Sequence, residues 1–384
     1  MQLLLPSFMK VIRSRSKVYL RSMCMSALMI FSSPIALAGI SSTMSVSYTG
    51  DTFQNVSGGV RRGNEYLDLL DITLNTDTEL SKTWTLTTAV QGLYSNGNSI
   101  SEELAGDIQI LSNLDGGGAF TKLGQATLQL SSTAGSVLVG LYDINAEFDV
   151  LESANLFINS AHGIGNDIAL TGENGPSIYP FYSLGVRAKL NIDNNQSIKV
   201  AILDAVPGSE TSLNAPQPEF NSDEGFFTIA EYAYQFHSSK MLIGAWQYSK
   251  DVETDNMQTK NMGAYARFEH QFDDQRTQAF VRIGYANEKA NLHDWFIGTG
   301  ISYADPFNIN ENDVAGFAIA YIQRGERVAE ERALTQPHET NFELTYLKNI
   351  NEYFYLQPNV QYIENAGFEN KHALALGVRL QVTF

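Results

Sequence analysis

Cysteine, long apolar runs and linker-like segments are all scarce in this chain of 384 residues. The single cysteine, Cys24, lies among the first 38 residues, so the remaining chain can form no disulfide. After residue 38, no apolar run approaches the roughly 20 residues that a transmembrane helix requires. No low-complexity tract or Pro/Ser-rich seam divides the chain, which argues against several domains joined by linkers.

Acidic residues are missing from the first 38 residues, which instead carry five Lys and Arg residues. A short apolar run at 23–31 follows most of these basic residues, and the segment closes on Ala36, Leu37 and Ala38. A basic region, an apolar core and a small-residue cleavage site are the parts of a secretory signal peptide. We therefore predict that residues 1–38 are a signal peptide, cleaved after Ala38.

Basic residues are scarce in residues 39–384, where 20 Lys and Arg stand against 42 Asp and Glu, a net charge of −22. Such an excess of acid disfavours binding to nucleic acid, whose phosphates are also negative. Nucleic acid is therefore not among the expected partners.

The sequence does contain many short segments in which apolar and polar residues alternate. In SLGVRAKL (183–190) the even-numbered residues are apolar, and the odd-numbered ones are small or basic. A period of two identifies a strand with one apolar and one polar face. Sixteen such strands are predicted, near 43–56, 64–76, 82–95, 119–132, 135–149, 179–192, 196–204, 226–236, 239–249, 259–272, 275–287, 293–304, 313–324, 339–349, 352–364 and 371–384.

The connections between these segments run short and long in alternation. An outer-membrane barrel has an even number of strands, short periplasmic turns and long external loops. The predicted fold class is therefore all-β, a transmembrane antiparallel β-barrel of about 16 strands that forms one domain over 39–384. A soluble secreted all-β protein is the alternative. The long loops are expected at 96–118, 150–178, 205–225, 250–258 and 325–338.

The alternation that runs to Phe384 fits a barrel, because the last strand would then pair with the first. A terminal aromatic residue after alternating apolar positions also resembles the sorting signal of outer-membrane barrels. We therefore expect Phe384 to be that signal, read by the barrel-assembly machinery. Outer-membrane lipid and lipopolysaccharide are then the expected surroundings of the protein.

The chain resembles the OprB family of carbohydrate-selective porins most clearly over 140–187, GLYDINAEFDVLESANLFINSAHGIGNDIALTGENGPSIYPFYSLGVR. The resemblance extends to 55–74, 92–113, 201–208 and 355–367, and to the C-terminal LGVRLQVTF. It implies an outer-membrane barrel through which sugars pass passively. No cofactor is expected.

By count, 150–178 joins the fifth and sixth strands and is the third external loop. In general porins that loop folds into the lumen and narrows it, and we expect the same here, with Leu156, Phe157 and Ile158 pinning it to the wall. A lid that stays at the surface is the alternative. Polar residues at the two ends of the loop are expected to line the constriction: Asp143, Asn145, Glu147, Asp149, Glu173 and Asn174.

Charged residues on the polar strand faces are the candidates for contact with a solute. Guanidinium and carboxylate groups hydrogen-bond well to sugar hydroxyls, and rings of charge select which solutes enter a pore. Each charge also has a simpler interpretation, in which it only balances its neighbours in a wet lumen. The predicted wall residues are Arg187, Lys189, Glu231, Arg267, Glu269, Arg282 and Arg379.

We predict a porin for passive, substrate-selective diffusion of carbohydrates of the glucose type. Acidic segments at 101–107, 209–224 and 326–331 would repel anions if they lie at the outer mouth. Related barrels also serve hydroxylated acids, so a porin for quinate-like solutes stays open, as does an adhesin or receptor barrel. The number of subunits is open too.

Catalytic signatures are absent from the sequence. The six histidines are scattered, no pair has the spacing of an H-E-x-x-H metal site, and GPSIYP (175–180) is not a G-x-S-x-G elbow. No enzyme activity, catalytic residue or metal ligand is therefore predicted.

Overall fold

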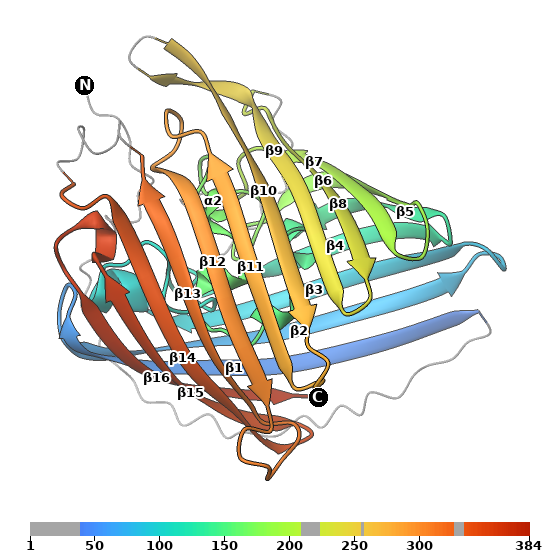
Figure 1. Cartoon of the computed structure of the whole chain (residues 1–384). Helices are drawn as coiled ribbons and strands as arrows, with labels where there is room; N and C mark the ends of the chain where they lie inside the picture. The colour runs from blue at the N-terminus through green and yellow to red at the C-terminus, as the bar shows by residue number, and fades with distance from the viewer. Residues whose placement is uncertain (1–38, 209–222, 255–256, 326–333) are drawn as a thin grey trace.

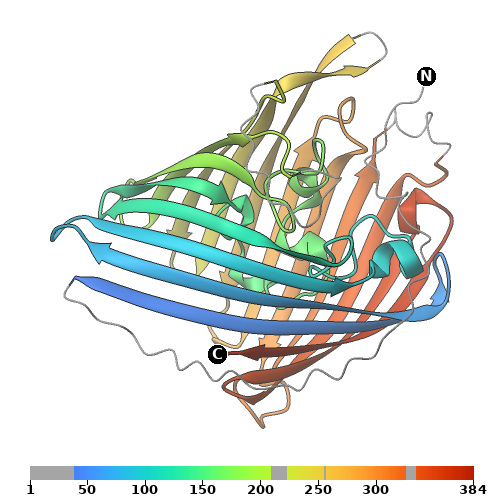
Figure 2. The same ribbon diagram turned by 180° about the vertical axis from the view of Figure 1, so that it is seen from behind.

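The computed structural model describes residues 39–208, 223–254, 257–325 and 334–384. Its strands form one closed antiparallel barrel, in which sequence neighbours pair and β1 pairs with β16 (Figures 1 and 2). The predicted fold class is therefore confirmed. The strands are β1 Ile40–Gly58, β2 Gly63–Glu79, β3 Thr85–Gly97, β4 Phe120–Ser132, β5 Gly135–Tyr142, β6 Ser183–Asn191, β7 Gln196–Asp204, β8 Phe226–Phe236, β9 Ser239–Thr254, β10 Met257–Gln271, β11 Thr277–Ala286, β12 His293–Ala304, β13 Val314–Arg324, β14 His338–Asn351, β15 Phe354–Glu364 and β16 Ala373–Thr383.

The period of two in the sequence separates the inner from the outer face of the wall. On β5 and β6, the paired residues Val139 and Val186 are each 49% exposed on the outer face. Their neighbours Leu138 and Arg187 also pair with each other and are buried on the inner face. An apolar outer face suits lipid, and closure of the sheet leaves no strand edge with unpaired backbone groups.

The last residue closes the barrel. Phe384 N donates to Val46 O at 2.9 Å, and Val46 N donates to Phe384 O at 3.1 Å. The Phe384 ring is exposed and stacks on Tyr353 with 6.0 Å between ring centroids. The predicted pairing of the last strand with the first is therefore confirmed.

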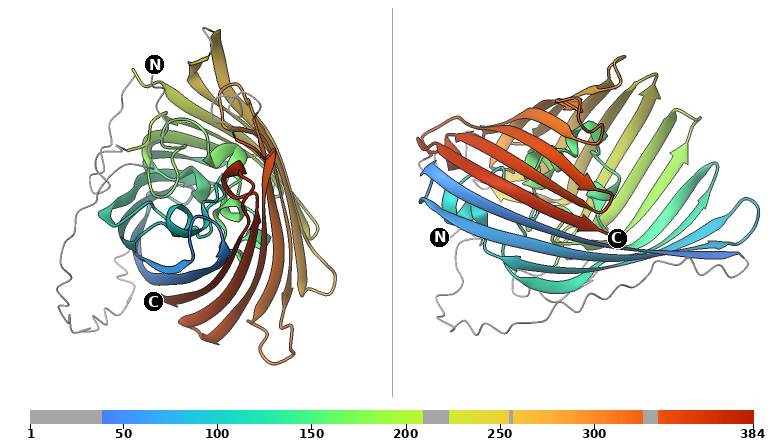
Figure 3. Two further views of the ribbon diagram at one scale, coloured as in Figure 1. Left: turned by 90° about the vertical axis from the view of Figure 1, so that its left-hand side faces the viewer. Right: turned by 90° about the horizontal axis from the view of Figure 1, so that it is seen from below.

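Two connections enter the ring of strands (Figure 3). We call residues 98–119, between β3 and β4, the second loop, and residues 143–182, between β5 and β6, the third loop. Both loops contain short helical turns. These are Ser101–Ala105 in the second loop, and Ile144–Ala146, Glu152–Ala154, α1 Ser160–Gly163 and α2 Asn166–Ala169 in the third. A further turn, Ala366–Phe368, follows β15.

No helix in the described part of the chain is long and apolar enough to cross a membrane.

The strands that flank the third loop are shorter than predicted, since β5 ends at Tyr142 and β6 begins at Ser183. Asp143 ends the pairing of β5 because its carboxylate accepts a hydrogen bond from Asn145 N at 2.8 Å and starts a helical turn. Asp149 then has a left-handed backbone with φ of 60°. The prediction that 143–149 continues the strand was wrong.

The prediction of a long loop at 250–258 was also wrong, because β9 continues to Thr254 and β10 begins at Met257. Lys260 pairs with Asp251 across this extension, and their side chains form an ion pair at 2.5 Å. A strand that is polar on both faces lacks the alternation by which strands are recognised.

Candidate functional site

The third loop lies against the inner wall of β10–β12 and is held there by buried ion pairs. Arg267 Nε lies 2.5 Å from Asp149 Oδ1, and Arg267 Nη2 lies 2.8 Å from Asp167 Oδ1. Arg282 Nη1 lies 2.9 Å from Asp149 Oδ1 and also donates to Asp149 O at 3.0 Å. All four side chains are almost fully buried. The predicted wall residues Arg267 and Arg282 therefore bind the loop.

Burial and charge act against each other in this cluster. Burial alone would raise the pKa of Asp149, but Arg267 and Arg282 outweigh it and hold that pKa below its usual value. For Asp167, burial is opposed by Arg267 and reinforced by Asp149, and the pKa rises to about 6. The cluster thus depends on its two guanidinium groups to keep both carboxylates charged.

Carboxylates of the wall bind backbone groups of the same loop. Glu231 accepts a hydrogen bond from Asp149 N at 2.8 Å and pairs with Lys199 at 2.7 Å. Glu269 accepts from Ser153 N at 2.9 Å and from Ser153 Oγ at 2.7 Å. Both predicted wall acids are therefore anchors of the third loop.

The start of the third loop is fixed to β6. Arg187 Nε and Nη2 donate to the two carboxylate oxygens of Glu147 at 2.6 and 2.7 Å, a bidentate pair. Asn145 Nδ2 donates to Phe148 O and Gly163 O, which joins two passes of the loop. Burial raises the pKa of Asp143 to about 7, although a hydrogen bond from Asn145 N opposes the shift.

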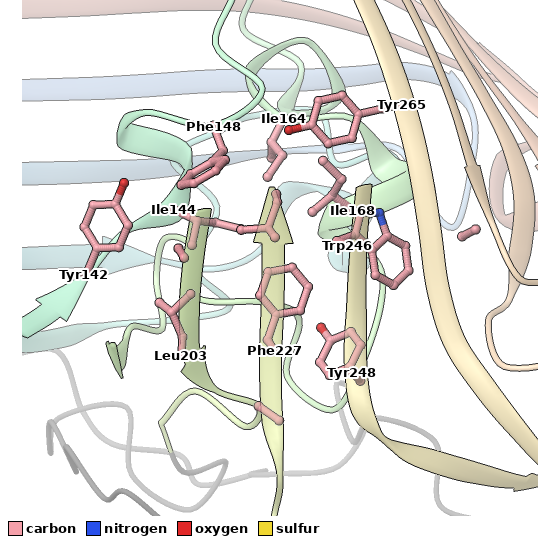
Figure 4. Packing of buried hydrophobic residues seen from close by; sticks show 14 of the residues in the cluster. Tyr142, Ile144, Phe148, Ile164, Ile168, Leu203, Phe227, Trp246, Tyr248 and Tyr265 are labelled. Atoms are coloured by element: carbon pink, nitrogen blue, oxygen red, sulfur yellow. The ribbon is translucent and has the colours of Figure 1, made fainter. Parts of the chain in front are cut away.

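An apolar contact completes the attachment (Figure 4). Ile144, Phe148 and Ile164 of the loop pack in one cluster with Phe227 and Trp246 of the wall. Burying side chains of this size stabilises the contact by about 1.5–3 kcal/mol each.

The predicted pinning residues contact other parts of the wall. Phe157 packs on Phe280 with ring centroids 5.8 Å apart, and Leu156 lies at the edge of the same cluster. Ile158 N donates to Glu343 at 2.7 Å. The third loop therefore folds inward as predicted and does not form a surface lid.

The second loop also lies in the lumen, which sequence reasoning missed. Glu339 of β14 accepts hydrogen bonds from Ile108 N, Gln109 N and Gly367 N at 2.7–3.1 Å. Asn113 N donates to Ile158 O at 2.9 Å, so the two loops touch each other. The polar inner face of β14, from Glu339 to Thr345, is the sequence signal that could have indicated buried loop backbone.

Arg379 belongs to this second attachment. Its guanidinium pairs with Asp51 at 2.8 Å and donates to Asn113 Oδ1 at 2.7 Å. Ser112 Oγ donates to the same Asp51 carboxylate at 2.6 Å. This predicted wall arginine therefore binds the second loop.

Substituting Glu339 tests directly whether this residue anchors the second loop. We expect Glu339→Ala to leave three N–H groups, one buried and two part-buried, without their acceptor and to lower the free energy of unfolding by on the order of 3 kcal/mol. The temperature at which the folded band is lost on electrophoresis measures the change. Glu352→Ala, at an exposed turn of the same hairpin, is the matched control. Equal effects of the two variants would contradict the anchoring role.

Three predicted residues lie apart from these anchors. Lys189 is half-buried on the inner face of β6, and Glu173 is exposed on the third loop. Asn174 Nδ2 donates to Pro207 O at 3.4 Å. The structure does not bring these three residues together with the arginine clusters.

Some inner-facing side chains of β2–β6 keep contact with solvent. Asp71, Gln91, Gln125, Gln129, Ser136 and Lys189, which we call the open face, are all half-buried. Inner residues that face the third loop, such as Ile229 and Arg282, are fully buried. The unfilled part of the lumen therefore runs along the open face.

Hydrogen bonds order the side chains of the open face. Gln91 Nε2 donates to Asp71 Oδ2 at 2.6 Å, and Gln91 Oε1 accepts from Gln125 N at 3.2 Å. Gln129 Oε1 accepts from Arg187 Nη2 at 2.5 Å. Amide and carboxylate groups held in this way are pre-positioned partners for hydroxyl groups of a passing solute.

Within residues 39–208, 223–254, 257–325 and 334–384, no group of three or more His, Cys, Asp or Glu side chains is arranged to hold a metal ion.

Comparison with known proteins gives one family match and several structural matches. The model of the family described as "Carbohydrate-selective porin, OprB family" matches residues 61–384. No curated protein sequence matches the chain.

The structural matches have low sequence identity. The high-pH structure of Pseudomonas putida OprB is 17% identical, with a TM-score of 0.76, over 89% of this chain and 94% of that one. Its low-pH structure is 16% identical, with a TM-score of 0.52, over 89% of this chain and 92% of that one. A variant of the Rh. blastica porin is 12% identical, with a TM-score of 0.57, over 89% of this chain and 100% of that one. At these identities the structures support the fold alone.

Proposed function

Since the chain belongs to the OprB family of carbohydrate-selective porins, we propose that it carries small neutral sugars of the glucose type across the outer membrane by passive diffusion. The family and the fold point to a transport channel rather than an enzyme, and they imply an outer-membrane location. Export by the predicted signal peptide at 1–38 and recognition of Phe384 by the assembly machinery belong to the proposal.

The observation that carries this proposal is the open face of the lumen. Its side chains carry three amides, one hydroxyl, one carboxylate and the ammonium of Lys189. Gln91 donates a hydrogen bond to Asp71 and accepts one from Gln125 N. Such groups exchange hydrogen bonds with sugar hydroxyls at little cost, because each replaces a bond to water. A site of this kind favours a hydroxylated solute over an apolar one of equal size.

Solute flux into proteoliposomes tests the function. We expect the purified protein to admit glucose faster, relative to urea, than diffusion through a featureless pore would allow. Asp71→Ala is expected to lower the ratio of the glucose rate to the urea rate several-fold, because Gln91 loses its partner. Asp77→Ala changes an exposed carboxylate further along the same face of β2 and is the matched control.

Two outcomes would speak against this function. Folded protein that admits neither solute would favour the receptor or adhesin interpretation. Flux of both solutes with the same ratio in both variants would indicate a general pore.

A further inference from the structure

Lys122 occupies an unusual position on the inner face of β4, close to the start of that strand. Its Nζ lies 4.3 Å from the centroid of the Phe120 ring and 4.6 Å from that of the Phe181 ring. Phe120 begins β4, and Phe181 belongs to the end of the third loop. The side chain is half-buried between two aromatic rings, which stabilise an ammonium group but do not neutralise it.

The lysine differs from most cations of the lumen. Each of the following has a carboxylate partner within an ion pair: Arg187 with Glu147, Lys199 with Glu231, Lys240 with Glu269, Arg267 with Asp149 and Asp167, Arg282 with Asp149, and Arg379 with Asp51. In the part of the chain that the structure describes, Lys122 and Lys189 have none. Their charge is therefore available to a solute.

Polar groups of the open face continue from the ammonium along the wall. Lys122 pairs with Leu93 across β3 and β4, and Gln91 lies two residues further along the same face of β3. Gln125 follows on β4 and is bonded to Gln91. A solute with a carboxylate at one end and hydroxyls along its length matches this order of an ammonium followed by amides.

We infer that Lys122, held between Phe120 and Phe181, binds the carboxylate of small hydroxylated acids, so that the channel takes sugar acids as well as neutral sugars. This inference rests on the proposed function, because the solute must reach the open face. The arginines suggested by the sequence do not serve this purpose, since each is already paired with a carboxylate.

Single-channel recording in planar bilayers tests the site, with gluconate as the acid and glucose as its neutral counterpart. We expect gluconate to block the wild-type channel at about tenfold lower concentration than glucose, as a charge-assisted hydrogen bond allows. Lys122→Gln is expected to raise the half-blocking concentration of gluconate about tenfold and to change that of glucose less than about twofold.

Lys189→Gln is the comparison variant, because Lys189 is the other unpaired lysine of the lumen. It is expected to raise the half-blocking concentration of gluconate clearly less than Lys122→Gln does, since Lys189 lies near the opposite end of the open face from Phe120 and Phe181. Lys122→Arg, which keeps the charge and can stack on both rings, is expected to retain the block. Phe181→Leu is expected to weaken the block by gluconate in part, because it removes one of the two rings and keeps the charge of Lys122.

The results separate this inference from the function on which it rests. Equal block by gluconate in the wild type and Lys122→Gln, with glucose flux intact, would overturn the inference and leave a sugar porin. If Lys122→Gln and Lys189→Gln weaken the block by gluconate equally, the inference is overturned as well, because a general effect of positive charge in the lumen would then explain the block. Absence of glucose flux through the folded wild type would overturn both.

Discussion

Deleting residues 152–174 and joining the ends with a short glycine–serine linker is expected to raise single-channel conductance several-fold. The deleted segment contains α1 and α2, and α2 lies in the lumen against β10–β12. Asp149 remains and keeps Arg267 and Arg282 paired, while Arg267 loses its second partner, Asp167. Both arginines therefore keep a carboxylate partner while the cross-section available to ions grows.

The same deletion is expected to reduce selectivity. The rate ratio of glucose to urea should approach that of free diffusion, because a wider lumen lets solutes pass without contacting the open face. Replacing residues 307–309 by glycine and serine is the control, since Phe307 and Ile309 are 65% and 78% exposed in the turn between β12 and β13. Unchanged conductance after the deletion would contradict the constricting role of the third loop.

The sequence predicted the barrel well because lipid and lumen impose opposite chemistry on alternate residues. In β6 the even residues Val186 and Leu190 face outward and Arg187 faces inward, as the period of two requires. Where both faces of a strand are polar, as near Asp251 in β9, the pattern vanishes and the strand was predicted as a loop.

The partners of the inner residues could not be predicted in the same way. Alternation places Arg267 on the inner face, but its partners Asp149 and Asp167 lie in a loop about a hundred residues away in sequence. Only the folded chain shows that this arginine anchors a loop while Lys122 stays unpaired. The second loop was missed because its attachment uses backbone N–H groups bound to Glu339, which leave no pattern in the sequence of the loop itself; the signal lies in the polar inner face of β14.

Replacing Arg267 by alanine is expected to lower the free energy of unfolding by about 3–5 kcal/mol, the usual cost of removing one partner of a buried ion pair. Asp149 and Asp167 are both fully buried, and the variant leaves them with Arg282 alone. Two charged carboxylates in a dry site are then compensated by one guanidinium. Chemical unfolding in detergent micelles measures the change.

The loss of unfolding free energy in Arg267→Ala, which we call the deficit, should depend on pH in a definite direction. In the wild type, the lowered pKa of Asp149 stabilises the folded state above about pH 4, and this contribution is lost as pH falls through the folded pKa. The raised pKa of Asp167, about 6, has the opposite sign and destabilises the folded state as pH rises between about 4 and 6. Without Arg267 the pKa of Asp149 rises from its lowered value and that of Asp167 rises further, so both carboxylates take up protons more readily. The deficit should therefore be largest near pH 8 and smaller at pH 5.

Arg276→Ala is the matched control for this prediction. Arg276 lies in the turn between β10 and β11, is 34% exposed and sits 3.7 Å from Asp305, so its ion pair is screened by solvent. Its guanidinium also donates to Ala304 O and Asn308 Oδ1 at this exposed turn. Its loss is expected to cost clearly less than that of Arg267 and to change little between the two pH values. A deficit for Arg267→Ala that is equally small, or that does not shrink between pH 8 and pH 5, would show that the buried carboxylates do not depend on this guanidinium. The third loop would then be held chiefly by its apolar contacts with Phe227 and Trp246.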